Sequence, residues 1–109
     1  MKKEFKTYYF FVMLNVKGEP VTNATRFKYF LVYEWGNANS DEIEMKANKK
    51  IYKIAELLSQ QDNVQYKVAN IDTVSTNEFN VLKKHFPTYS YHKDTLMSIN
   101  TTGDTDDEE

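Results

Sequence analysis

The sequence predicts a single α+β domain, in which a small antiparallel sheet carries helices packed on one face. Two long segments are rich in aromatic and β-branched residues, which is typical of strands. A third segment repeats apolar residues at helical spacing, and the elements follow the order strand, strand, helix, strand, helix (β-β-α-β-α). The 109 residues suffice for one compact domain and leave no room for two.

The two segments near the N-terminus are expected to form an antiparallel hairpin. The first strand is expected over residues 5–16, where no helical stripe is present. Glycine, proline and asparagine between residues 18 and 23 indicate the loop that follows. The second strand is expected over residues 26–35 and is closed by Gly36. The two strands are expected to pair because sequential strands usually do.

A long helix is expected to begin at Ser40 and to end near residue 60 or 61. Ser40 suits the N-cap position, and acidic residues follow in the first turns, where the helix dipole favours anions. The apolar residues of this segment form one stripe: Ile43, Ala47, Ile51, Ile54 and Leu58.

The remaining elements are shorter. A third strand is expected over residues 64–73, and Ser75 with Glu78 resembles the capping box that opens a short helix. One side of that helix is apolar: Phe79, Leu82 and Phe86. Pro87 is expected to stop it, and residues 88–99 show no clean period.

Composition limits the classes of protein to consider. We expect residues 1–99 to form one α+β domain and residues 100–109 to form a disordered acidic tail. The formal net charge of -2 argues against an overall preference for nucleic acid or anionic lipid. Cysteine is absent, which excludes disulfides and favours a reducing compartment, so a cytoplasmic location is expected. No segment approaches the roughly 18 apolar residues of a membrane span.

Both of the first two strands are apolar on both faces, and one long and one short helix can cover only one face of the sheet. One interpretation is an exposed patch, of the kind that marks binding surfaces. Its residues are Tyr9, Phe11, Met13, Phe30 and Val32. The other interpretation is that the segment from Tyr89 to Ile99 folds over the second face and completes a two-sided core.

Four lysines lie on one face of the long helix, away from its apolar stripe: Lys46, Lys49, Lys50 and Lys53. They are candidates for contact with phosphates or with an acidic partner, and the alternative is a solvated helix face. The single arginine, Arg26, counts against a dedicated nucleic-acid binder, because arginine is the preferred residue for bidentate phosphate recognition.

The sequence offers no catalytic constellation. His85 and His92 are expected to be surface or capping residues, since no motif places further ligands or a nucleophile with them. The glycines are isolated and form no loop that could hold a phosphate. We therefore expect no enzyme activity, no metal site and no cofactor.

Small size, high lysine and asparagine content and few motifs give a composition similar to that of accessory proteins of phages and other mobile elements. Many such accessory proteins act by binding a host or defence protein, so this similarity implies a function in protein binding. We expect a non-enzymatic protein-interaction module, an inhibitor or adaptor, that uses the aromatic sheet face to bind a partner protein or a second copy in a homodimer, with no membrane contact. The alternative is a single-stranded nucleic-acid-binding protein that uses the sheet aromatics and the helix lysines.

Overall fold

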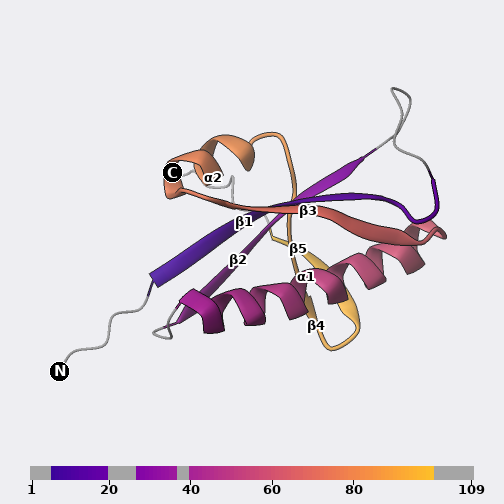
Figure 1. Ribbon diagram of the computed structural model, residues 1–109, viewed down its shortest axis with the longest axis horizontal. Helices are drawn as coiled ribbons and strands as arrows, with labels where there is room; N and C mark the ends of the chain where they lie inside the picture. The colour runs from indigo at the N-terminus through magenta and orange to yellow at the C-terminus, as the bar shows by residue number, and fades with distance from the viewer. Residues whose placement is uncertain (1–5, 20–26, 37–39, 100–109) are drawn as a thin grey trace.

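The computed structural model describes residues 6–19, 27–36 and 40–99. In chain order the elements are β1 (Lys6–Val16), β2 (Lys28–Gly36), α1 (Ser40–Asp62), β3 (Tyr66–Val74), α2 (Thr76–Leu82), β4 (Thr88–His92) and β5 (Thr95–Ile99). The five strands form one sheet in the order β3-β1-β2-β4-β5 (Figure 1). The predicted α+β class is confirmed, whereas the tail expected over residues 100–109 lies outside the described residues.

The sheet is mixed rather than fully antiparallel. Strand β1 lies between β2 and β3 and pairs antiparallel with both. Strand β4 joins β2 in parallel orientation through one pair of residues, Leu31 and Thr88, and β5 pairs antiparallel with β4. Residues 88–99, which lacked a clear period in the sequence, are therefore a hairpin that extends the sheet.

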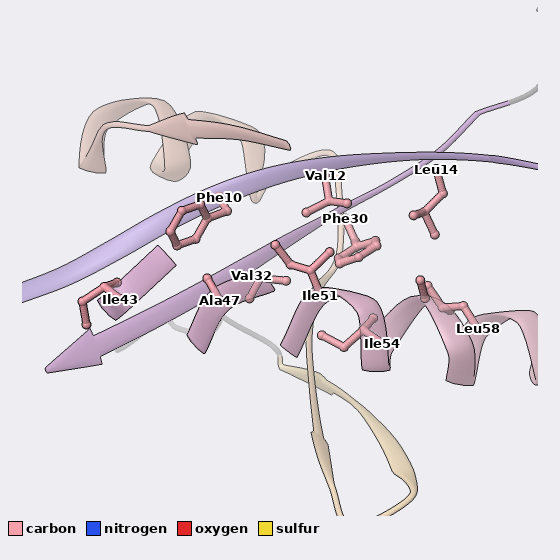
Figure 2. Packing of buried hydrophobic residues seen from close by; sticks show 11 residues of the cluster. Phe10, Val12, Leu14, Phe30, Val32, Ile43, Ala47, Ile51, Ile54 and Leu58 are labelled. Carbon is pink, nitrogen blue, oxygen red and sulfur yellow. The ribbon is translucent and has the colours of Figure 1, made fainter. Parts of the chain in front are cut away.

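Helix α1 covers one face of β1 and β2 and buries the main core there (Figure 2). Its predicted apolar stripe is confirmed, because all five stripe residues are buried. They pack against alternate residues of the two strands: Phe10, Val12, Leu14, Phe30 and Val32. Burying a large aliphatic or aromatic side chain of this kind stabilises the fold by about 1.5–3 kcal/mol.

Helix α2 lies on the opposite side of the sheet from α1 (Figure 1), so the two helices do not share one face as the sequence suggested. Side chains alternate along a strand, and Tyr9 of β1 therefore points away from the α1 core. Its ring stacks on Phe79 of α2, with 4.2 Å between ring centres. The predicted capping box is confirmed: Ser75 Oγ accepts from the Glu78 N–H, and the Glu78 carboxylate accepts from the Ser75 N–H.

The hairpin of β4 and β5 packs beside α1 instead of folding over the second face. Tyr89, Tyr91 and Leu96 are half-buried against the α1 core. Lys53 of α1 forms an ion pair with Asp94 in the hairpin turn, with 2.8 Å between nitrogen and oxygen. The expectation that Tyr89–Ile99 covers the second face is therefore wrong, because β4 and β5 extend the edge of the sheet and pack against the α1 core.

Candidate functional site

The structure divides the predicted aromatic patch between two faces. Phe30 and Val32 are fully buried beneath α1 and lie opposite the α1-facing residues of β1. The expectation that they belong to an exposed patch is wrong, because residues directly opposite in an antiparallel pair share a face. The other three members of the patch lie on the second face: Tyr9, Phe11 and Met13.

On the second face the aromatic rings pack against one another. Phe11 stacks on Tyr29 with ring centres 5.4 Å apart, and Phe86 packs at 5.0 Å from Phe11 and 5.4 Å from Tyr29. Tyr9 is stacked on Phe79. We call these five residues the aromatic cluster. Stacking of nucleic-acid bases requires accessible ring faces. In the aromatic cluster, a neighbouring ring of the same chain covers one face of each of the four stacked rings, Tyr9, Phe11, Tyr29 and Phe79.

Strands β2 and β4 separate beyond their single pairing, and a hollow opens between them. At the point of contact the Leu31 N–H donates to the carbonyl oxygen of Pro87 at 2.8 Å. Past this bond the hollow has a volume of about 410 Å³. Its lining comes from β2, α1 and β4: Glu34, Lys46, Lys49, Lys50, Ser90 and Tyr91. We call it the lysine hollow.

The Lys50 side chain contacts β2 at the point where its pairing with β4 ends. If the parallel pairing of β2 and β4 continued, the Tyr33 carbonyl would accept a hydrogen bond from a β4 N–H. The ammonium of Lys50 donates to that carbonyl instead, at 3.0 Å, and lies 5.2 Å from the centre of the Tyr33 ring. Burial lowers the pKa of Lys50, an effect that the Glu34 carboxylate opposes and that Lys46 reinforces. Lys50 is thus a partly desolvated cation held in a fixed position.

The structure brings three of the four predicted lysines to this hollow. Lys46 and Lys49 are exposed, in contrast to the half-buried Lys50. Lys53 serves a different contact, because it pairs with Asp94 at 2.8 Å and with Glu56 at 3.8 Å. Its hydrogen bond to Asp94 raises the pKa of Lys53.

The sequence did not reveal the contribution of β4 to the hollow. Ser90 and Tyr91 lie more than thirty positions from the lysines, in the segment without a clear period. The only available signal was the alternation of Tyr89 and Tyr91, which is typical of a strand but does not say which strand is its neighbour.

The chemistry of the lysine hollow suits an anion. Lysine ammonium groups can donate hydrogen bonds to carboxylate or phosphate oxygens, and such charge-assisted bonds are stronger than neutral ones. Among the described residues that line the hollow, Glu34 is the only one with a carboxylate. His85 and His92 are both exposed and do not line the hollow. Across residues 6–19, 27–36 and 40–99, no group of three or more His, Cys, Asp and Glu residues could hold a metal ion.

Neither helix of the described chain is long and apolar enough to cross a membrane. Comparison of the sequence and the fold with protein-family models, curated proteins and solved structures found no match.

Proposed function

We propose that the protein is a non-enzymatic protein-interaction module that binds an acidic segment of a partner protein in the lysine hollow. The observation that carries the proposal is the meeting of three α1 lysines with two residues of β4, Ser90 and Tyr91, where β2 and β4 separate. Carboxylate side chains of a partner would accept hydrogen bonds from the lysine ammonium groups. A module of this kind suits an adaptor or an inhibitor.

The position of Lys50 supports binding rather than a purely structural role. An ammonium that loses hydration is costly unless it is paired. Lys50 donates to one carbonyl and lies over one ring face, and the Glu34 carboxylate acts on it through its charge. An incoming carboxylate would add a second opposite charge to that of Glu34 and a charged hydrogen-bond acceptor for the ammonium. Binding would therefore restore part of the solvation that Lys50 loses on folding.

Three features favour an acidic protein over single-stranded nucleic acid. In the aromatic cluster, each of the two stacked pairs covers one face of both of its rings, which leaves fewer ring faces for bases. The cations of the hollow are lysines, which do not offer the bidentate geometry of arginine. Glu34 in the lining repels a continuous phosphate backbone but can be avoided by a peptide whose carboxylates are spaced apart.

The proposal is tested by fluorescence anisotropy with two labelled probes of equal length, a decapeptide of alternating glutamate and glycine and a thymidine decamer. The protein is expected to bind the peptide more tightly than the oligonucleotide. Replacing the three lysines of the hollow by glutamine is expected to weaken peptide binding about tenfold, since each exposed ion pair contributes up to about 1 kcal/mol.

A matched control separates this site from general charge attraction. Lys17, Lys67 and Lys84 are exposed and do not line the lysine hollow. Their replacement by glutamine changes the net charge by the same amount and is expected to alter peptide affinity less than about twofold. Equal losses in both triple variants would overturn the proposal. Tighter binding of the thymidine decamer, lost in the hollow variant, would favour the nucleic-acid alternative instead.

A further inference from the structure

The two edges of the sheet differ in how well they are protected. Strand β3 forms one edge, and its ladder with β1 is irregular at Ala69, which lies between the partners of Met13 and Leu14. Lys67 and Asp72 also lie on this edge strand. Bulges and charged residues are the usual means by which proteins prevent an edge from pairing with another chain.

Strand β5 forms the other edge and has neither protection. Its sequence from Thr95 to Ile99 has no charged residue and no proline, and it pairs with β4 over all five residues without a bulge. Figure 1 shows the β4–β5 hairpin projecting past α1. In an antiparallel pair joined by a two-residue turn, hydrogen-bonded pairs alternate with non-hydrogen-bonded ones. The backbone groups of Leu96 and Ser98 therefore point to the open edge.

We propose that β5 pairs antiparallel with β5 of a second copy, around a two-fold axis at Met97. Leu96 and Ser98 lie symmetrically about Met97, so each copy offers the other the same outward N–H and C=O groups. Leu96 of one copy then faces Ser98 of the other, twice, which gives four main-chain hydrogen bonds. Such a self-complementary contact is the isologous type found in two-fold dimers, and it unites two sheets into one of ten strands.

The side chains of this register are compatible with the pairing. Met97 is 46% exposed and would lie directly opposite its symmetry mate, where each covers apolar surface of the other. Thr95 would face Ile99, and no like charges meet within the paired residues. The pairing does not involve the lysine hollow, so its test is independent of the test of the proposed function.

Cysteine cross-linking tests the two-fold register directly, because the chain contains no cysteine. Opposite residues of a non-hydrogen-bonded pair have Cα atoms about 4.5 Å apart, within the range that a disulfide bridges. Met97→Cys under mild oxidation is expected to give a covalent species of about twice the 12.9 kDa chain mass. Thr73→Cys, at the β3 edge, is the matched control and is expected to stay a single chain. Absence of cross-linking at Met97, or equal cross-linking at Thr73, would overturn the proposal.

A proline substitution tests the edge in another way. Ser98→Pro removes one outward N–H and leaves the β4 ladder intact, which is the setting in which strands tolerate proline. By light scattering after size exclusion, the native chain is expected to be dimeric and Ser98→Pro monomeric, with circular dichroism showing that both are folded. Thr73→Pro makes the same change at the β3 edge and is expected to remain dimeric. A native chain that is monomeric from micromolar to millimolar concentration would refute the pairing.

Discussion

The ammonium nitrogen of Lys50 lies 3.0 Å from the carbonyl oxygen of Tyr33 and 5.2 Å from the centre of the same residue's ring. This contact occupies the place of a main-chain hydrogen bond between β2 and β4, and the lysine hollow opens beside it. Because burial lowers the pKa of Lys50, the charged form is less favourable here than in water. A charge kept at such a position suits the binding of an anion better than the stabilisation of the fold.

Lys50→Met is the first prediction. Methionine keeps an unbranched apolar stem but removes the charge, so the lost hydrogen bond and the relieved desolvation offset each other. The free energy of unfolding measured in urea is expected to change by less than about 1 kcal/mol, while binding of the acidic decapeptide weakens. A decrease of more than about 3 kcal/mol in the free energy of unfolding would show that the role of Lys50 is mainly structural.

The pH dependence of binding is the second prediction. The folded-state pKa of Lys50 lies below the ordinary 10.5, so this ammonium loses its proton before an ordinary lysine does. Affinity for the acidic decapeptide is expected to fall as the pH rises from neutral toward 10.5, and anisotropy titrations at a series of pH values measure it. Lys50→Met removes the titrating group and serves as the control, with an affinity that stays flat over the lower part of this range. If the affinity of both proteins fell over the same lower part of the pH range, Lys50 would not be the group that titrates there.

Phe11→Asp is the third prediction. If Phe11 were on an exposed patch, this variant would fold and lose only its partner. Phe11 instead packs against the rings of Tyr29 and Phe86, and a carboxylate there would lose hydration without gaining a partner. We expect the free energy of unfolding to fall by about 3 kcal/mol or more, which circular dichroism would show as a strongly lowered melting temperature. Val81→Asp, at a site that is 57% exposed, is the control and is expected to melt within a few degrees of the native protein.

The fourth prediction concerns the C-terminal end of α1. Asp62 accepts hydrogen bonds from the Tyr66 hydroxyl at 2.6 Å and from the Lys28 ammonium at 2.9 Å. These bonds, that from Tyr66 above all, lower the pKa of Asp62 below 3.8. A lowered carboxylate pKa contributes stability that is present above the unfolded value and is lost as the pH falls through the folded value.

Asp62→Asn is therefore expected to cost about 1 kcal/mol at pH 7 and to lose less stability than the native protein on acidification. Urea denaturation at neutral pH and below pH 3.8 measures both. Burial and the nearby Asp62 raise the pKa of Tyr66 to about 12 from 10.0. The stability that this raised pKa of Tyr66 contributes is present below pH 10 and is lost as the pH rises from 10 to 12.

If Asp62→Asn lost as much stability on acidification as the native protein does, the hydrogen bonds of Asp62 with Tyr66 and Lys28 would not couple folding to acid pH.

The sequence predicted the elements well where one periodicity dominates. Helix α1 begins at Ser40 as expected, and its stripe is buried throughout, because a 3.6-residue repeat leaves one orientation toward a core. Strand β2 was assigned the wrong exposed face because it is apolar on both faces. A two-residue repeat then fits two orientations, and only the register with β1 decides that Phe30 and Val32 meet α1.

The lysine hollow could be predicted only in part. Helical spacing placed the lysines on one face of α1, but the parallel contact of Leu31 with Thr88 joins segments far apart in the chain. No local sequence pattern specifies such a contact. The position of Ser90 and Tyr91 depends on this contact, so the sequence does not specify it either. The covering of the second face by α2 was missed for the same reason, since the stacking of Phe79 on Tyr9 is a tertiary contact.

Titration of the isotope-labelled protein with the acidic decapeptide, followed by amide NMR shifts, tests the proposed binding site most directly. The largest shifts are expected at residues that line the lysine hollow: Glu34, Lys46, Lys49, Lys50, Ser90 and Tyr91. Shifts that concentrate on α2 or on the β3 edge, or no shifts in the hollow at peptide concentrations that saturate binding, would contradict the proposed function.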